Sequence, residues 1–201
     1  MPLTIHFVRH GHVYNPDNIY YGRLPNFRLS EDGQKQAQAA AQALANAPIV
    51  AVYCSPQQRA QETAAYIAKP HQLMPIVDEG LNEVYSPFDG ITQEELANVR
   101  QFDLYKGAPS PYEQPQDVMA RIEDFIARMQ QAHDGEEIVA VTHGDPLAFT
   151  ILYAHGRPVT TEEKGALHKY GVPDGYPQTA SIFSLTLDGD KIIQTRYTRP
   201  Y

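Results

Sequence analysis

The chain has 201 residues, of which 42% are hydrophobic and 20% are charged, and its net charge is −8 at pH 7. This length and composition fit one globular domain, residues 1–201, that buries a substantial core. The acidic balance argues against a broad nucleic-acid surface, which needs clustered Lys and Arg, although a few arginines can still converge in a small cationic pocket.

The sequence has no feature of a membrane or secreted protein. No apolar run approaches the ~18 residues that a membrane span needs, and the first residues lack the basic flank and apolar stretch of a signal peptide. The single cysteine, Cys54, excludes an internal disulfide framework. These observations favour a soluble, cytoplasmic protein with no membrane partner. No coiled-coil or clear interface signal is present, so the oligomeric state stays open.

The first half of the chain alternates predicted strands and helices. Residues 4–8 are β-branched and aromatic and predict a strand. Residues 12–29 hold Asn, Pro, Gly and several aromatic residues without a sustained period, which predicts a long ordered loop. A helix is predicted from Ser30 to about Asn46, with two acids in its first turn, and a buried strand over 49–54.

The next helix has a specific predicted start. Ser55 can cap it, Pro56 suits the first helical position, and Gln58 is placed to close a capping box. The helix should run to about Ala68. A short connection and a third strand are predicted within 70–77.

The second half is irregular before it returns to regular elements. The predicted order is a turn at 86–90, a short helix near 92–100, a Pro-rich loop, a helix from 117 to about 132, a fourth strand over 138–142, a helix through 153, and a hairpin of 181–187 with 192–197. Strands that alternate with helices predict an α/β fold with a mostly parallel sheet.

Polar segments follow the ends of three predicted strands, at 9–11, 54–59 and 142–144. Open α/β sheets place their ligand crevice at the carboxyl ends of the strands, so these segments are expected to meet there. Two of the strands end in His-Gly, and glycine after a histidine lets the backbone turn sharply and a ligand approach closely.

These segments carry the groups that bind and attack a phosphoryl group. Arg9 and Arg59 offer forked donors to phosphate oxygens. Arg59 also falls near the first turn of a helix, where free N–H groups favour an anion, and His143 can donate a further hydrogen bond. Positive charge around His10 disfavours its protonated form, so we expect a neutral ring that can attack phosphorus.

The same residues lie in motifs that resemble the histidine phosphatase (phosphoglycerate mutase-like) superfamily over nearly the whole chain. The motifs are Arg9-His10-Gly11 followed by Asn15, Gly22-Arg23 with 29–33, Ser55-Pro56 with Arg59 and Glu62-Thr63-Ala64, Leu81-Asn82-Glu83 with Phe88-Asp89-Gly90, and Thr142-His143-Gly144. Five motifs in the right order and spacing make the resemblance specific. It implies a three-layer α/β/α sandwich around a mostly parallel central sheet.

The resemblance also implies a two-step reaction on a small phosphorylated metabolite. His10 takes the phosphoryl group as a phosphohistidine, Glu83 protonates the leaving oxygen, and water then releases phosphate. The groups expected to hold the phosphoryl group are Arg9, Asn15, Tyr21, Gly22, Arg59, His143 and Gly144. The scheme needs no metal or other cofactor, because arginines stabilise the transition-state charge.

The chain departs from the family pattern at three places that bear on substrate identity. Tyr21 stands where a smaller or amide side chain is usual, 109–113 replaces a Gly-Glu-Ser motif, and Asp145-Pro146 follows the second His-Gly. In the family these positions line or border the substrate entrance.

Other functions stay open at this point. A phosphoglycerate mutase would use the same phosphohistidine, but true mutases of this family tend to carry longer covering insertions, which favours a phosphatase. A non-catalytic phospho-ligand domain is expected to have lost at least one of the five catalytic candidates, and all five are present.

Several residues also have plainer interpretations. Cys54 with Arg59 resembles a cysteine phosphatase signature with one residue too few between them, so Cys54 is expected to be a buried strand-end residue. His6 and His12 flank His10, but no carboxylate or cysteine nearby completes a metal site; His6 is expected in the core and His12 on a loop surface.

Acidic and aromatic residues near the motifs add further alternatives. Asp78, Glu79 and Asp89 compete with Glu83 as the proton donor, and Glu162-Glu163 is expected to be a solvated face. Aromatic residues in predicted loops can either form a substrate entrance or pack on one another: Tyr14, Tyr20, Tyr21, Phe27, Tyr85, Phe88 and Tyr112.

Overall fold

A computed structural model describes residues 1–201 and places a six-stranded sheet at the centre, in the order β3-β2-β4-β1-β5-β6. The strands are β1 (Leu3–Arg9), β2 (Ile49–Cys54), β3 (Ile76–Val77), β4 (Glu137–Thr142), β5 (Ile182–Asp188) and β6 (Lys191–Thr198). The first four pair in parallel, and β5 runs antiparallel to both β1 and β6. The predicted mostly parallel sheet and its closing hairpin are confirmed.

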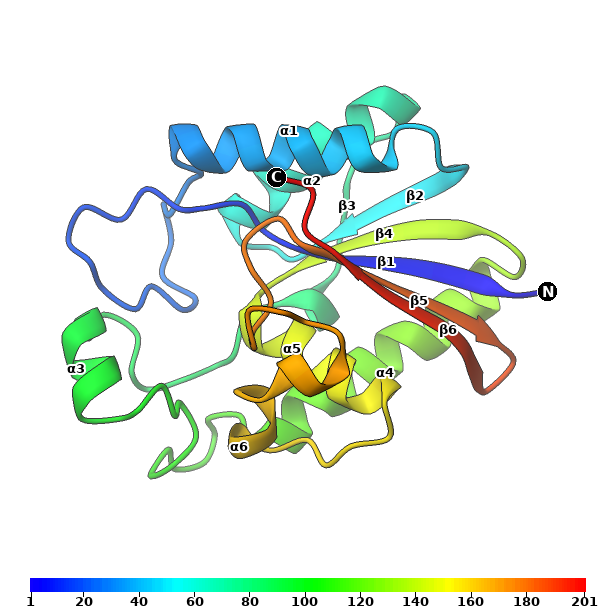
Figure 1. Ribbon diagram of the computed structural model, residues 1–201. Coiled ribbons are helices and arrows are strands. Elements are labelled where there is room, and N and C mark those ends of the chain that lie inside the picture. The colour runs from blue at the N-terminus through cyan, green and yellow to red at the C-terminus, as the bar shows by residue number, and fades with distance from the viewer.

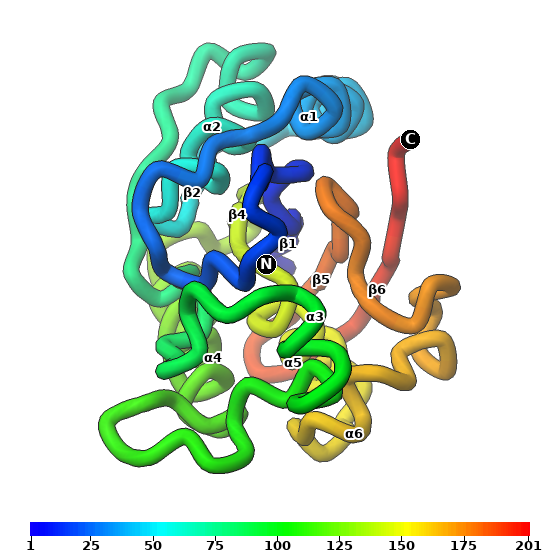
Figure 2. Tube along the Cα trace, turned by 90° about the vertical axis from the view of Figure 1, so that its left-hand side faces the viewer, coloured from blue at the N-terminus to red at the C-terminus, as the bar shows by residue number.

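Helices cover both faces of the sheet, which gives the three layers seen in Figure 1 and, end on, in Figure 2. On one face lie α1 (Glu31–Leu44) and α2 (Gln58–Ala68), and on the other α4 (Pro115–Ala132) and α5 (Gly144–Ala154). Two short helices, α3 (Gln93–Asn98) and α6 (Thr161–Lys164), and three 3-10 turns at Lys69–His71, Glu79–Leu81 and Leu167–Tyr170 complete the chain. No helix has both the length and the apolar character to cross a membrane.

The apolar strands are explained by the two covering layers. Along β1, Leu3, Ile5 and Phe7 join the cluster packed under α4 and α5, whereas Val8 joins the cluster under α1 and α2. Alternate residues of a strand point to opposite faces, so a strand covered on both sides is apolar nearly throughout. The carboxyl ends of β1 and β4 are thereby fixed side by side, with Arg9 paired to Thr142.

The start of α2 differs from its prediction. The helix begins at Gln58, and its cap residue Gln57 makes no side-chain capping bond. The Ser55 oxygen accepts the N–H of the cap residue Gln57 at 3.2 Å and bonds the ring of His143 at 2.7 Å, so it caps no residue within the helix. The Gln58 amide reaches Glu62 instead of closing a capping box. Ser55, which has a capping side chain, thus contacts a site residue instead of capping the helix. Arg59 still lies in the first helical turn, as predicted.

The loop after β1 is ordered by close backbone contact with the start of α1. A Cβ atom on Gly33 would lie 1.9 Å from the carbonyl oxygen of His12, and one on Gly11 would lie 2.5 Å from the carbonyl oxygen of Gly33. Only glycine permits two chain segments to approach this closely. The loop then crosses the carboxyl end of the sheet, where Ile19 bridges to Thr92 ahead of α3.

Candidate active site

The carboxyl end of the sheet opens into a cavity of about 1080 Å³. Its inner wall includes Arg9, His10, Glu83, Gly144 and Asp145, and its outer wall is formed by the segment around α3 and by the start of α6. Two of the three strand ends from which the sequence predicted a site border this cavity, through Arg9, His10 and Gly144. No residue of 54–59 lines it, and Arg59 and His143 are completely buried.

His10 is buried, and its hydrogen bond defines which ring nitrogen is free. Nδ1 lies 2.8 Å from the carbonyl oxygen of Gly11. A carbonyl oxygen only accepts, so Nδ1 carries the proton and the lone pair of the neutral ring lies on Nε2. The ring is therefore arranged for attack through Nε2.

Burial and two cations act on His10 in the same direction. Burial lowers the pKa of the His10 imidazole well below its ordinary value, and the charges of Arg59 and Arg9 lower it further. Both effects disfavour the protonated ring. At neutral pH the ring is neutral and its Nε2 keeps its lone pair.

Arg59 is completely buried behind His10. Its Nη2 donates to the carbonyl oxygen of Gly22 at 2.7 Å and to Nδ1 of His143 at 3.1 Å, and its guanidinium carbon lies 4.7 Å from the centre of the Tyr21 ring. Its Nε is buried and has no hydrogen-bond partner in the protein, and the same is true of Nε of Arg9. Both arginines thus retain donors for a phosphate oxygen.

His143 is held between Arg59 and Ser55, and its ring lies 5.1 Å from that of His10. Because Nδ1 accepts from the guanidinium, Nε2 carries the proton of the neutral ring and donates to Ser55. Burial lowers the pKa of His143 well below its ordinary value, and the charge of Arg59 adds to this. In this arrangement His143 orients Arg59 and has no spare N–H of its own, in contrast to the free donor expected from the sequence.

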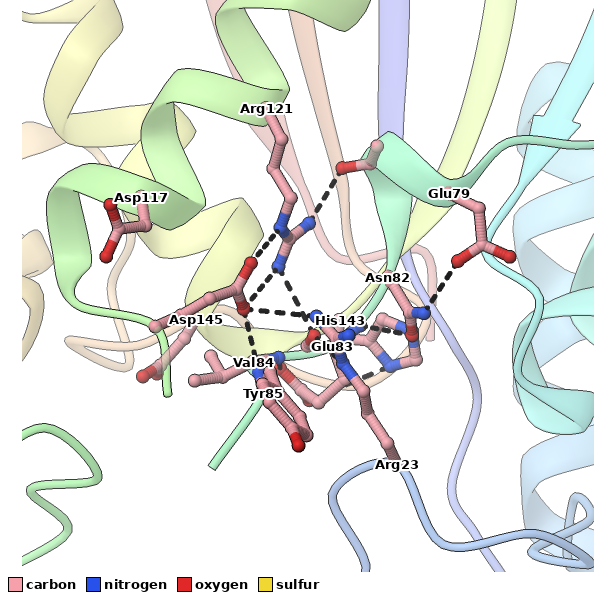
Figure 3. A network of polar contacts seen from close by, with 12 residues as sticks. Arg23, Glu79, Asn82, Glu83, Val84, Tyr85, Asp117, Arg121, His143 and Asp145 are labelled. Carbon is pink, nitrogen blue, oxygen red and sulfur yellow. Dashed lines mark hydrogen bonds and ion pairs between the residues drawn. The ribbon is translucent and has the colours of Figure 1, made fainter. Parts of the chain in front are cut away.

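Glu83 is a buried acid in the wall of the cavity, and its main chain is held from two sides (Figure 3). Its carbonyl oxygen accepts from Nε of Arg23 at 2.7 Å and from Nη2 of Arg121 at 3.3 Å. Of its carboxyl oxygens, Oε1 accepts the N–H of Val84 at 2.9 Å and Oε2 lies 3.7 Å from Nδ1 of His143. The segment is therefore fixed, while the carboxyl group faces the site.

The pKa of Glu83 is raised, mainly because burial disfavours the carboxylate. The charge of Arg59 opposes this effect, and the negative charge of Asp145 adds to it. A carboxyl group with a raised pKa keeps its proton at a higher pH and can donate it to a leaving oxygen. Burial and charge thus suit Glu83 to the role of a general acid.

The competing acids are engaged elsewhere. Asp78 forms an ion pair with Arg128 at 2.7 Å, Glu79 accepts from the side chain of Asn82 at 3.1 Å, and Asp89 accepts the N–H of Arg23 at 2.9 Å. None of the three lines the cavity, whereas Glu83 does.

Two expected site segments are not brought to His10. The amide of Asn15 forms both of its hydrogen bonds with the main chain of Ile19, at 2.8 and 3.2 Å, and lines a neighbouring cavity of about 390 Å³. Residues 109–113 do not line the larger cavity, and Glu113 pairs with Arg23 at 3.1 Å and with Arg121 at 2.8 Å. Tyr21 and Asp145 do line it.

The loop aromatic residues mostly contact one another or an arginine. Tyr85 packs against Tyr112 with ring centres 4.9 Å apart, and Tyr14 and Phe88 lie against Arg28 and Arg100. Of the seven proposed for an entrance, two line the larger cavity, Tyr20 and Tyr21. Tyr21 also stacks on Phe27 at 5.1 Å.

The residues with plainer interpretations behave as expected. Cys54 is buried, and burial raises its pKa to about 11, which disfavours the reactive thiolate. His6 is buried and bonds Ser184 and Glu137, and His12 is exposed and bonds Ser30. The expected solvated face of Glu162-Glu163 is confirmed only in part: Glu162 is exposed and lines the outer part of the cavity, whereas Glu163 is half-buried and accepts from the Tyr170 hydroxyl at 3.0 Å.

Three residues that the sequence did not assign to the site hold its members in place. Ser55 accepts from His143; the Thr63 hydroxyl accepts the N–H of Gly11 at 3.1 Å and donates to the carbonyl of Arg59 at 2.8 Å. Tyr176 lies under the guanidinium of Arg9, 5.5 Å from its carbon. Ser55 and Thr63 lie within the motif that contains Arg59, so that motif could have indicated that they belong to the site. Tyr176 lies in no motif.

Comparison with known proteins identifies the family of the chain. The family model of the histidine phosphatase superfamily (branch 1) matches residues 5–173. The chain is 36% identical over 207 residues to the uncharacterized protein Rv0525 of Mycobacterium tuberculosis. This alignment covers 98% of this chain and 96% of that protein. It is 29% identical over 150 residues to phosphoserine phosphatase 1 of Hydrogenobacter thermophilus, covering 70% of each. The native structure of mycobacterial glucosyl-3-phosphoglycerate phosphatase Rv2419c superimposes with a TM-score of 0.77 at 26% identity, covering 98% of this chain and 97% of that one.

Proposed function

Because the chain belongs to the histidine phosphatase superfamily, we propose that it is a phosphomonoesterase that hydrolyses a small phosphorylated metabolite, acting in the cytoplasm. The observation that carries the proposal is the state of His10. Its neutral ring has the lone pair on Nε2, and Arg9 and Arg59 lie close enough for their charges to lower its pKa. Two relatives with similar sequence or structure are phosphatases by name.

In the first step Nε2 of His10 attacks phosphorus and the bond from phosphorus to the ester oxygen breaks. The electron pair of that bond stays with the leaving oxygen, which takes the proton of Glu83 and departs as an alcohol. The guanidinium groups of Arg9 and Arg59 stabilise the negative charge that spreads over the other phosphoryl oxygens. Glu83 is left as a carboxylate.

In the second step the roles reverse. The Glu83 carboxylate takes a proton from a water molecule as that water attacks the phosphohistidine, and the phosphorus–nitrogen bond breaks. Phosphate leaves with its charge still balanced by the two arginines, the His10 ring regains its lone pair, and Glu83 regains its proton. Acid and base are the same group, as microscopic reversibility allows for such pairs of steps.

The test is phosphate release from a panel of phosphorylated metabolites by the wild-type protein and by His10→Ala. We expect turnover by the wild type and a loss on the order of 10³-fold or more in the variant, because His10 is the one histidine that lines the cavity. His168→Ala, which removes an exposed histidine, is the matched control and should retain wild-type rates. Undiminished turnover in His10→Ala would refute the mechanism.

A second assay separates hydrolysis from phosphoryl transfer. With 3-phosphoglycerate as substrate, isomerisation and phosphate release are followed together. We expect release to dominate, because the cavity that contains His10 is large relative to a small phosphate ester. Isomerisation faster than hydrolysis would identify a mutase instead.

A further inference from the structure

Asp145 is a second buried acid in the wall of the cavity, and the mechanism above does not use it. Its Oδ1 accepts from the Tyr176 hydroxyl at 2.6 Å, and its Oδ2 accepts from Tyr105 at 2.7 Å and from the Lys164 ammonium at 2.6 Å. Three donors thus hold the carboxylate from the protein side. A carboxylate held by an ammonium and two hydroxyl groups is a negative charge fixed in place.

The donors come from three separate segments that surround the site. Tyr105 precedes α4, Lys164 ends α6, and Tyr176 lies in the loop before β5. The contact with Tyr176 depends on Gly144, because a Cβ atom there would lie 2.4 Å from the tyrosine hydroxyl oxygen. The glycine after the second histidine thus makes room for a bond to the acid that follows it.

The two acids of the cavity have opposite environments. Burial alone would raise the pKa of Asp145, but the ammonium of Lys164 and the three hydrogen bonds outweigh it, and the pKa is lowered. Burial raises the pKa of Glu83, and Asp145 is the nearby negative charge that raises it further. Environments that push the pKa values of two acids apart assign one acid to hold a charge and the other to hold a proton.

The other groups around Glu83 act in the opposite sense or are neutral. The charged or titratable groups that face it from β1, α2, α4, α5 and the neighbouring loops are Arg9, Arg59, Arg121, His143, Asp145, Arg23, Tyr20, Tyr21, Tyr105 and Tyr176. The arginines favour the carboxylate form of Glu83. Asp145 is the acid among these groups, and its charge counters theirs.

We propose that Asp145 is a positioning residue that keeps Glu83 protonated for its role as proton donor, by holding a permanent negative charge in the wall of the same cavity. The proposal rests on the proposed phosphatase mechanism. Lys164 and the two tyrosines keep Asp145 ionised. Repulsion between the two acids is therefore relieved by protonation of Glu83 and not of Asp145. Both acids are drawn in Figure 3.

The test is the pH dependence of kcat/KM for an alkyl phosphate with the wild type and with Asp145→Asn. Above the pKa of Glu83 the donor is ionised and the rate falls, which gives the profile a basic limb. Removal of the Asp145 charge lowers the pKa of Glu83, so we expect the basic limb to move to lower pH by about one unit, with a loss of about tenfold on that limb. The substrate's own ionisation is the same for both enzymes and cancels in the comparison.

Tyr105→Phe is the matched control, because it removes one hydrogen bond from Asp145 and leaves its charge in place. We expect its basic limb to coincide with that of the wild type. An equal shift in both variants, or a uniform loss at every pH in Asp145→Asn, would show a merely structural role and overturn the proposal.

A second substrate adds an independent readout. The leaving group of p-nitrophenyl phosphate departs without a proton, so at a pH on the basic limb Asp145→Asn should lose much less activity on it than on the alkyl phosphate. Equal losses on both substrates would overturn the proposal. If Asp145→Asn does not fold, the wild-type profile decides, and a basic limb at or below about 4.3, the ordinary pKa of Glu, would overturn it.

The failure of this inference differs from the failure of the proposed function. If the wild-type enzyme hydrolyses phosphate esters through His10 but Asp145→Asn has the same basic limb, only the role of Asp145 is refuted. A wild-type protein that releases no phosphate from any ester refutes the function on which the inference rests.

Discussion

Arg59 should be the residue at which activity and stability separate most clearly. It is completely buried and donates to the Gly22 carbonyl and to His143, and its Nε remains without a protein partner. Arg59→Met replaces it with an apolar side chain of similar length. Loss of a charged donor to the transition state is worth a factor of about 10²–10³ in kcat.

The stability change should be much smaller. The substitution leaves two buried acceptors without their donor, at roughly 1–3 kcal/mol each. It also removes a buried charge that is itself costly to desolvate, and replacing such charges by apolar groups often offsets the lost bonds. We therefore expect the free energy of unfolding to change by no more than about 2 kcal/mol.

The assay combines kcat for phosphate release with urea denaturation of the same preparations. Arg59→Lys is the comparison variant, because it keeps the charge but lacks the fork that spans two acceptors and a phosphate. We expect Lys to recover about tenfold of the activity lost in Met and no more. A kcat for Arg59→Met within tenfold of the wild type, in a protein that unfolds normally, would refute the assignment of Arg59 to the phosphoryl group.

Two further substitutions test local claims. Gly22 has φ +35°, and an added Cβ would lie 1.8 Å from Oδ1 of Asp89, so Gly22→Ala should lower the free energy of unfolding by about 1–3 kcal/mol; an unchanged denaturation midpoint would contradict the strain. Cys54 is buried with its pKa raised to about 11, so Cys54→Ala should keep kcat within about twofold. A loss of two orders of magnitude in the kcat of Cys54→Ala would instead favour a reaction in which the Cys54 thiolate is the nucleophile.

The sheet and most helices could be predicted from the sequence because their signals are local. The apolar run of β4, the spacing of apolar residues in α4 and the turn between β5 and β6 each depend on a few neighbouring residues. The start of α2 could not be predicted in the same way. Ser55 has a capping side chain, but the partner that takes its hydroxyl, His143, lies 88 residues further along the chain.

The same distinction applies to the site. His10, Arg59 and His143 lie at strand ends and in motifs, so sequence spacing predicts that they meet. Arg23 and Arg121 hold the main chain of Glu83 across 60 and 38 residues, and a side-chain bond to a backbone oxygen requires no particular residue type at its acceptor. Contacts of this kind leave no pattern in one sequence and emerge only from the fold.

The mechanism proposed for the site needs a neutral His10 and a protonated Glu83, and the surroundings favour the first more consistently than the second. At His10, burial and the charges of Arg59 and Arg9 all lower the pKa and outweigh the hydrogen bond to Gly11, which raises it, so the neutral ring is favoured. At Glu83, burial and Asp145 raise the pKa while the same arginines lower it, so the protonated donor depends on a balance. The arginines proposed to bind the phosphoryl group therefore favour the neutral form of the proposed nucleophile and disfavour the protonated form of the proposed acid. It follows that loss of the Asp145 charge should displace the basic limb of the pH profile, which reports Glu83. The acidic limb, which reports His10, should stay in place. Displacement of the acidic limb alone would show that Asp145 acts on His10 and not on Glu83.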